Sequence, residues 1–477
     1  MQNKKQIILS IIAIVTLAIL VIGASFAYFA AQGNTSAQTS ATVKTYTVNV
    51  FSFETGDPIS FSLNQENFAS GKGNQTGSTF AKAILTANNK TNTATEHYNM
   101  YLNISENTFD YSIDENTPEI LLTITDGTNP VTNITSLTYK TVTDGKGNSI
   151  SGYDITNKTG LIELFSNREI TTTSTKTENW NISVTFINYN ADQSKNAGNT
   201  FSGKVLIQKE KITLLADYVI SQYTGTQGDN ALYYHNSTLT NGAGDNSYRY
   251  AGARDSVNNY ICLGSDATTC PDANLFRIIG VFGDQTKVIR AKSVGDKQWH
   301  TSNDNTWSSS SLNTYLNGEY LTGLGTLADK IATTTWKVGG GTPANISGVV
   351  PATAYKNEVG SSASTTTVNK KIGLMYVSDY YYSASPSAWT LVGYNSSDAT
   401  KDYRAATSTN WLYLSSPEWT ISRYSDSTNS AFFVNSTGLV GNRGVTSSFG
   451  VRPSFNLLSS VTYASGSGTS SDPIRIN

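Results

Sequence analysis

Residues 275–290 read LFRIIGVFGDQTKVIR, and this stretch decides the fold class of the C-terminal half of the chain. The largely apolar run 275–282 and the run 286–290 flank the tripeptide Gly283-Asp284-Gln285. Two strand-like runs that are separated by a short turn with Gly and Asp predict a β-hairpin. We therefore expect a strand on each side of a tight turn.

The sequence after this hairpin mixes helical and strand patterns. Residues 307–324 (WSSSSLNTYLNGEYLTGL) have the spacing of a helix, which a serine at 308–310 can cap and Gly318 can end. Apolar or aromatic runs predict strands at 372–377, 411–421 and 431–434. The C-terminal half is therefore expected to be an α+β domain with many loops.

The N-terminal half has a different pattern, in which apolar and polar residues alternate. Period-2 runs rich in Val, Ile, Tyr and Thr, separated by turns with Asn, Gly or Asp, predict a β-sandwich. A short helix is expected at 214–223. The runs that carry the sandwich prediction are 46–53, 99–104, 120–125, 180–187 and 203–207.

The first residues predict export from the cytoplasm. Residues 7–29 form an uncharged apolar run long enough to cross a bilayer, and Lys4 and Lys5 before it orient the remainder of the chain outward. The length favours an uncleaved transmembrane anchor, whereas Ser25-Phe26-Ala27 offers the small residues of a signal-peptide cleavage site. Both alternatives place the chain on the extracellular face of the membrane or at the cell surface.

These patterns predict five segments. They are a signal or transmembrane segment (1–31), a linker (32–43), a β-sandwich domain (44–211), a short helix with a linker (212–246) and a C-terminal domain (247–477).

The composition excludes some functions. Charged residues make up only 14% of the chain, compared with about 25% in typical soluble domains. The formal net charge is −2, and no basic stripe is present that could neutralise phosphates, so we exclude nucleic-acid binding. The 27 tyrosines are typical of a binding surface.

The two cysteines, Cys262 and Cys270, lie in the segment CLGSDATTC. An isolated, closely spaced pair in an exported chain favours a local disulfide. Two free thiols and half of a metal site are the alternatives, and the second of these would need further ligands nearby. We expect no metal and no cofactor.

The C-terminal region resembles a family of bacterial surface domains with a C-type-lectin-like fold. Its closing G-V-R-P element is also similar to the end of the variable proteins of diversity-generating retroelements, which use this fold to display changeable binding residues. The matching motifs are LFRIIG (275–280), WS (307–308), YLN (315–317), NWL (410–412), EWTIS (418–422), Gly438 and GVRPSFNL (450–457).

Departures from related families limit what this resemblance implies. Calcium-dependent animal lectins carry E-P-N or Q-P-D motifs, and this chain has Pro417-Glu418-Trp419 instead, so a calcium-dependent sugar site is not implied. The pair Cys262 and Cys270 does not match the arrangement of the formylglycine-generating relatives. The N-terminal half is similar to camelysin and to the β-sandwich subunits of Gram-positive biofilm-matrix fibres.

Catalytic patterns are weak. Asp110, Asp114, Glu115 and Glu119 cluster in FDYSIDENTPE, where a solvated loop, a weak calcium site and the acids of a glycoside hydrolase are the alternatives. We favour the solvated loop. There is no G-x-S-x-G motif, and the three histidines, His97, His235 and His300, are expected to be exposed or strand-edge residues.

Aromatic residues crowd the stretch 380–424 together with Ser, Asn and Asp, which indicates either a core or a binding face. Trp411 and Trp419 are expected in the core, and Arg452 is expected to form a structural salt bridge or to anchor a loop. The candidate ligand-binding residues, all in loop-like context, are Tyr413, Arg423, Tyr424, Asp426, Asn429, Asn442 and Arg443.

The sequence therefore predicts an extracellular, non-enzymatic protein in which a C-terminal domain binds a glycan or protein ligand in the manner of an adhesin. The β-sandwich would serve as its stalk, and the N-terminal helix would hold it in the membrane. The alternatives are a structural subunit of an extracellular fibre or matrix and a surface glycoside hydrolase.

Overall fold

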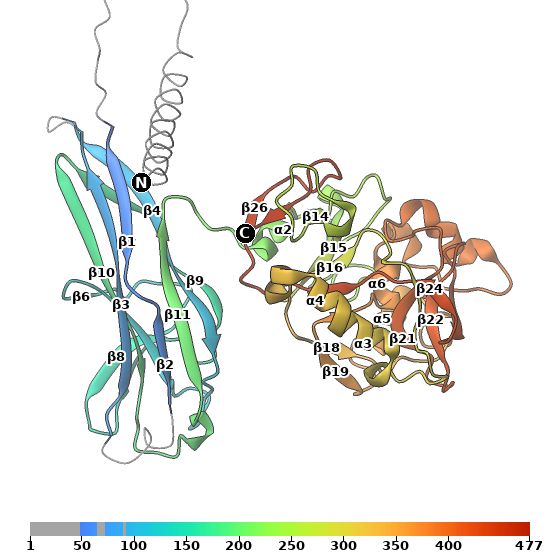
Figure 1. Cartoon of the computed structure of the whole chain (residues 1–477), viewed down its shortest axis with the longest axis horizontal. Helices are drawn as coiled ribbons and strands as arrows, with labels where there is room; N and C mark the ends of the chain where they lie inside the picture. Colours follow the sequence, from blue (N-terminus) through green and yellow to red (C-terminus); the bar gives the residue numbers. More distant parts are fainter. Residues whose placement is uncertain (1–47, 64–71, 89–91) are drawn as a thin grey trace, which may run out of the picture. The chain divides into compact units, whose positions relative to one another are not determined.

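The computed structural model of the chain describes residues 48–63, 72–88 and 92–477 (Figure 1). Strands account for 39% of the structure and helices for 16%, so the fold is mainly β, as predicted. The expected export segment at 7–29 and the linker at 32–43 lie outside the described residues. Within the described ranges, no helix is long and apolar enough to cross a membrane.

Two antiparallel sheets form a β-sandwich from residues 50–208 (Figure 1). The first sheet has the order β1-β3-β10-β5-β8-β7, with β6 paired to β5, and the second has the order β2-β11-β4-β9. The first contains β1 Val50–Thr55, β3 Gln75–Thr86, β5 Ile120–Asp126, β6 Asn129–Pro130, β7 Tyr139–Thr143, β8 Ser149–Asp154 and β10 Thr175–Phe186. The second contains β2 Ile59–Ser62, β4 Ala94–Asn107, β9 Gly160–Thr172 and β11 Thr200–Gln208.

Alternating side chains from the two sheets fill the space between them. Met100, Leu102 and Ile104 of β4 are buried in the same cluster as Ile182 and Val184 of β10. Successive side chains of a strand point to opposite faces, so every second residue of each run enters this core. The runs predicted at 99–104, 120–125, 180–187 and 203–207 are therefore confirmed as strands.

A second group of sheets is built from residues 232–476. The larger has the order β12-β13-β15-β16-β25-β20, with β14 paired to β15, and the smaller has the order β17-β24-β21-β22-β23. The larger contains β12 Leu232–Tyr234, β13 Tyr248–Tyr250, β14 Tyr260–Cys262, β15 Leu275–Phe282, β16 Gln285–Arg290, β20 Ile372–Gly373 and β25 Ser454–Asn456. The smaller contains β17 Asp296–Gln298, β21 Glu418–Arg423, β22 Ser430–Val434, β23 Val440–Gly444 and β24 Ser448–Gly450.

Two short ribbons and several helices complete this region, which is α+β, as expected. The ribbons pair β18 Thr334–Lys337 with β19 Thr367–Lys370, and β26 Tyr463–Ser465 with β27 Arg475–Ile476. The helices are α2 Leu215–Ser221, α3 Ser311–Tyr315, α4 Leu321–Gly323, α5 Pro351–Glu358 and α6 Val377–Tyr382, and the largest buried cluster lies among these elements.

The predicted hairpin at 275–290 is confirmed. Strand β15 pairs with β16 in antiparallel register across a two-residue loop, and Gly283 adopts a φ of 63° that a glycine accommodates without strain. The short helix predicted at 214–223 is confirmed as α2.

Three other element predictions need correction. Ser310 caps α3 as expected, by accepting a hydrogen bond from the Asn313 N–H at 3.1 Å, but Gly318 does not end the helical segment, because a π-turn at 316–320 continues it into α4. The strand predicted at 411–421 begins only at Glu418, and the strand predicted at 372–377 ends at Gly373.

The predicted disulfide between Cys262 and Cys270 is confirmed, which rules out free thiols and a metal site at this pair. Cys262 ends β14 and is buried, so the bond ties the loop that follows to the large sheet.

Replacing both cysteines with serine is expected to lower the free energy of unfolding by about 2–3 kcal/mol, the loop-closure value for so short a loop. Urea unfolding followed by tryptophan fluorescence measures this change, since six of the seven tryptophans lie beyond residue 298. An unchanged transition midpoint would show that the crosslink does not stabilise the region.

Candidate functional site

The start of helix α6 gathers two buried carboxylates. The main-chain N–H of Tyr376, the N-cap residue, donates to Asp379 Oδ2 at 2.8 Å. The next two N–H groups, of Val377 and Ser378, donate to Glu358 at 2.9 and 2.8 Å. The first amides of a helix lack partners within it and attract negative charge, so the local backbone explains why both acids are held here.

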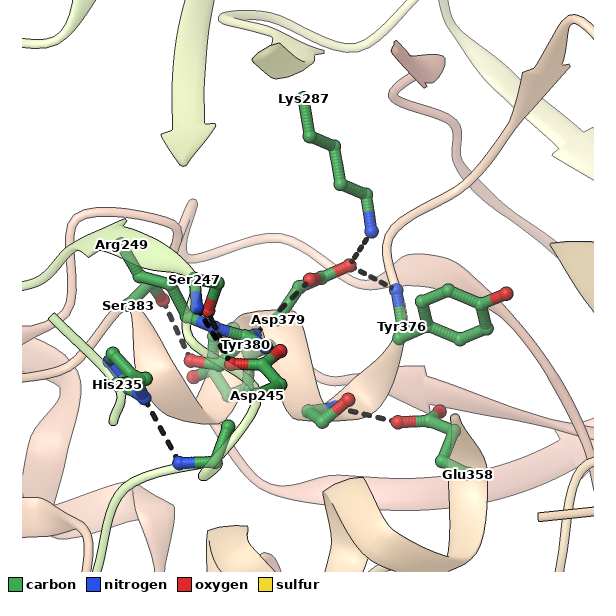
Figure 2. Close-up of polar contacts among 12 residues, drawn as sticks. His235, Asp245, Ser247, Arg249, Lys287, Glu358, Tyr376, Asp379, Tyr380 and Ser383 are labelled. Carbon is green, nitrogen blue, oxygen red and sulfur yellow. Dashed lines mark hydrogen bonds and ion pairs between the residues drawn. The ribbon is translucent and has the colours of Figure 1, made fainter. Parts of the chain in front are cut away.

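Asp379 also binds a lysine from the large sheet. Lys287 of β16 places Nζ 2.5 Å from Asp379 Oδ2, and the two side chains are only 7% and 3% exposed. Figure 2 shows Lys287 reaching toward Asp379 from the side opposite α6. A charge that is buried to this degree is stable only when it is paired, so each of these residues requires the other.

Arg249 of β13 lies on the other side of Asp379, with Nη1 4.0 Å from Oδ1 (Figure 2). Its guanidinium also donates to Asp245 Oδ2 at 2.6 Å and to Ser247 Oγ at 2.7 Å. Burial opposes ionisation of Asp245, but the charge of Arg249 and the Ser247 hydroxyl outweigh it and lower the Asp245 pKa to about 2. The two cations, Arg249 and Lys287, and the two anions, Asp245 and Asp379, therefore balance one another in charge.

Aromatic rings surround this set and form a pocket of about 140 Å³. Lys287 Nζ lies 4.7 Å from the ring centre of Tyr376 and 5.6 Å from those of Trp336 and Phe282. The guanidinium of Arg249 lies 5.0 Å from the ring of Tyr355. We call this the aromatic pocket, and it is lined by Phe282, Trp336, Tyr355 and Tyr376 with Arg249, Lys287 and Asp379, and by Thr334, Thr335, Lys337, Val359, Ser378 and Asn456.

Local features hold the pocket walls in place. Trp336 Nε1 donates to the Lys370 carbonyl at 3.0 Å, across the β18–β19 ribbon. A Cβ at Gly373 would lie 2.9 Å from the indole atoms of Trp336, so glycine permits the close approach of the ring. Burial and the neighbouring carboxylates raise the pKa of the Tyr376 hydroxyl, which therefore stays protonated.

Both carboxylate oxygens of Glu358 accept hydrogen bonds from the protein. Besides the two amides of α6, it accepts a hydrogen bond from the Ser422 hydroxyl of β21, and burial raises its pKa. It therefore joins α5, α6 and the smaller sheet and serves a structural role.

The structure brings six of the seven predicted ligand residues to one end of the smaller sheet. Arg423, Ala431 and Arg443 are in register across β21, β22 and β23, and Asn442 is paired with Phe432. Tyr424, Asp426 and Asn429 belong to the turn that joins β21 to β22. Tyr413 is not with them, because its hydroxyl donates to the Ser436 carbonyl at 2.6 Å, beyond the other end of β22.

The aromatic stretch belongs mainly to the core. Tyr380, Tyr381, Tyr382 and Trp389 are buried, whereas Tyr394 is 45% exposed. Trp411 and Trp419 are buried, as predicted. Arg452 forms the predicted structural salt bridge, with Nη2 2.6 Å and Nε 2.7 Å from the two oxygens of buried Glu418.

The predicted environments of two histidines are wrong. His235 is completely buried and packs against Tyr382 and Trp389, and His300 is only 8% exposed. His235 Nδ1 accepts a hydrogen bond from the Ala243 N–H at 3.1 Å. Its burial and the charge of Arg249 lower its pKa well below the usual value.

The acidic cluster of the sandwich is only partly the solvated loop that was predicted. Asp110, Asp114 and Glu115 are exposed, but Glu119 is completely buried and accepts a hydrogen bond from Gln193 Nε2 at 2.5 Å. Glu119 is therefore unavailable to a substrate. Within residues 48–63, 72–88 and 92–477, no group of three or more His, Cys, Asp or Glu side chains could hold a metal ion.

Part of the chain is similar to a known protein family. A family model described as "Domain of unknown function (DUF6273)" matches residues 283–459, which is somewhat more than a third of the chain. The matched segment contains Lys287, Trp336, Tyr376 and Asp379 but not Arg249. No curated protein matches the chain.

Sequence reasoning missed the aromatic pocket. Its polar residues are far apart in the chain, and the partners of the Lys287–Asp379 pair are separated by 92 positions. A usable signal is a charged residue beside buried apolar or aromatic residues, such as Lys287 in TKVIR (286–290) and Asp379 in VSDYYY (377–382). Such charges are almost never fully buried unless they are paired.

Asp379→Asn is expected to lower the free energy of unfolding by about 3–5 kcal/mol, because it leaves Lys287 buried without a counter-charge. Lys287→Met is expected to lower it by less, since the guanidinium of Arg249 remains 4.0 Å from Asp379. The double variant should lose less than the sum of the two. Urea unfolding followed by tryptophan fluorescence tests this cycle.

The pair Lys292–Asp272 is the matched control, since its Nζ–Oδ2 distance is also 2.5 Å but its side chains are 64% and 67% exposed. Lys292→Met should change stability by less than about 0.5 kcal/mol. Equal effects at the buried and exposed pairs would contradict the assigned role of burial.

His235 is expected to make the region sensitive to mild acid. Its folded pKa is depressed, so the unfolded chain binds a proton near pH 6.5 that the folded chain does not, and stability falls as pH decreases below that value. The slope is at most about 1.4 kcal/mol per pH unit.

The difference in unfolding free energy between the chain and His235→Gln, measured between about pH 7 and 5, isolates this contribution. Glu358 acts in the opposite direction, because its raised pKa adds stability as the pH falls, but it is common to both proteins and cancels. A pH-independent difference would rule out protonation of His235 as the cause.

Proposed function

We propose that this chain is a non-enzymatic surface protein whose region 232–477 binds a glycan unit in the aromatic pocket, with the β-sandwich as its stalk. The pocket is the observation that carries the proposal. It combines four aromatic rings with fixed hydrogen-bonding groups, the combination by which apolar faces and hydroxyls of a sugar are both recognised. Its volume of about 140 Å³ is below the range of drug-sized sites and suits a single small unit.

The interactions that hold the carboxylates of Asp379 and Glu358 favour ligand binding over hydrolysis. A glycoside hydrolase needs two carboxyl groups that are free to exchange protons or attack the sugar across a cleft. Asp379 is engaged by Lys287 and the Tyr376 amide, and Glu358 by two amides and a hydroxyl. Neither carboxylate has the freedom that this chemistry requires.

A larger pocket in the same region is a weaker candidate for the ligand-binding site. It measures about 690 Å³ and lies beside the disulfide loop, and the described residues that line it include no aromatic ring. Its Arg475 guanidinium is bound to the carbonyls of Ser265, Ala267 and Thr268. The cation therefore has little capacity left for a ligand.

Extracellular placement is supported by three features that agree with one another. They are the apolar, uncharged run at residues 7–29, the low content of charged residues, and the disulfide, which forms and persists in oxidising compartments. The membrane is accordingly proposed as one partner and an extracellular glycan as the other.

A steric block tests the pocket. Thr335 lines the pocket and is exposed, so Thr335→Trp adds a bulky side chain at the pocket wall without disturbing the core. The neighbouring exposed Thr333 does not line the pocket, and Thr333→Trp is the matched control. Residues 48–477 are applied to arrays of glycans and cell-wall fragments, and the bound unit is titrated by calorimetry.

We expect saturable binding that weakens by at least about tenfold in Thr335→Trp and is unchanged in Thr333→Trp, because a bulky side chain at the pocket wall excludes the unit that the rings contact. Equal affinity of the two variants would place binding elsewhere. An absence of binding by the folded chain would favour the fibre or matrix subunit instead.

A further inference from the structure

A second pocket, away from the aromatic pocket, contains an arginine that forms no ion pair with a described carboxylate. It has a volume of about 500 Å³. We call it the arginine pocket, and it is lined by Arg254, Tyr260, Leu275, Ala291, Lys292, Tyr413, Leu414, Ser415 and Ser470. Tyr413, one of the ligand residues predicted from the sequence, is part of its wall.

The guanidinium of Arg254 is incompletely used by the protein. Its Nη2 donates to the main-chain carbonyl of Tyr413, and Arg254 makes no ion pair with any described residue. A guanidinium carries five N–H donors in a planar fork that fits the oxygens of a carboxylate, sulfate or phosphate. Most of these donors are therefore available in the pocket.

A second positive charge is fixed behind the pocket wall. Arg277 of β15 is 1% exposed, and its guanidinium lies 4.2 Å from the ring centre of Tyr260 and 4.6 Å from that of Trp411. It donates only to neutral acceptors, namely Asn259 Oδ1 and the carbonyls of Arg254 and Val257, and its Nη1 has no hydrogen-bond partner in the described chain. Burial and nearby cations lower its pKa to about 9, so it remains charged at neutral pH.

A buried arginine without an ion-pair partner is unusual within this protein. Three arginines are buried in the described residues, and the other two, Arg249 and Arg452, are paired with Asp245 and Glu418. Arg277 has no such partner. Around the pocket, Lys292 is paired with Asp272 at the surface, and Asp255 is exposed. Asp255 acts on both Arg254 and Arg277 from a distance, but neither guanidinium forms an ion pair with a described carboxylate.

We propose that the arginine pocket binds an oxyanion (a carboxylate, sulfate or phosphate group), with Arg254 as the direct partner and Arg277 as a fixed charge behind Tyr260. A buried charge without a counter-ion is costly, and an anion that enters the pocket supplies one. Tyr260, Tyr413 and Leu275 give the pocket apolar walls that contact the group carrying the anion. This site is independent of the aromatic pocket.

The test uses the full chain at constant ionic strength, with inorganic sulfate, inorganic phosphate and glucuronate as probes and glucose as the uncharged comparison. Binding is measured by calorimetry. Arg254→Gln removes the direct partner, and Ser470→Trp places a bulky side chain at an exposed position of the wall. Ser471→Trp is the matched control, because Ser471 is exposed and does not line the pocket.

We expect at least one anionic probe, but not glucose, to bind, and its affinity to fall roughly tenfold to a hundredfold in Arg254→Gln, the usual loss for a charge-assisted hydrogen bond. Ser470→Trp should weaken binding similarly, and Ser471→Trp should not. Tighter binding of sulfate or phosphate than of glucuronate would identify the natural ligand as a free inorganic ion. Tighter binding of glucuronate would identify it as a sugar acid. No binding of any anion, or binding that survives either pocket variant, would overturn the proposal.

Discussion

The region 232–477 depends on the neutralisation of one buried carboxylate. Asp379 caps the start of α6, binds Lys287 from β16 and faces Arg249 from β13, so three elements that are distant in the chain are joined at one side chain. Removing Asp379 leaves Lys287 buried without a counter-charge, whereas removing Lys287 leaves Asp379 with only the more distant guanidinium of Arg249. The aromatic rings around this set exclude water and thereby strengthen each interaction within it.

Much of the fold could be predicted because its strands carry local signals. The run at 275–282 is apolar except for Arg277, and Gly283-Asp284 supplies the tight turn, so both strands of the hairpin were identifiable. The alternating run at 99–104 was equally clear, because one face of β4 is buried in the sandwich. Strands β3 and β9 were missed, since the polar residues in GLIELFSNREITT obscure the alternation of β9.

The sites were less predictable because pairing across the fold has no local signature. His235 lies in a stretch rich in Gly and Asn that reads as an exposed linker, yet Tyr382 and Trp389 enclose it. The run 380–382 offered two alternatives, and helix α6 turns all three tyrosines into the core. Arg452 was correctly assigned a structural role, because a charge before Pro453 in an apolar segment requires a partner, and Glu418 provides it.

The two pockets differ in how their charges are balanced, and this difference bears on what each can recognise. Beside the aromatic pocket the two buried cations, Arg249 and Lys287, are paired with Asp245 and Asp379, and Lys337 adds one partly exposed charge that solvent screens. Selectivity there depends mainly on ring contacts and hydrogen-bond geometry. At the arginine pocket Arg254 and Arg277 form no ion pair within the described chain, so the sign of the ligand's charge decides whether it binds. If both proposals hold, a glycan that carries an acidic group would engage the region through two physically distinct contacts. Its binding would then depend on salt at one contact far more than at the other.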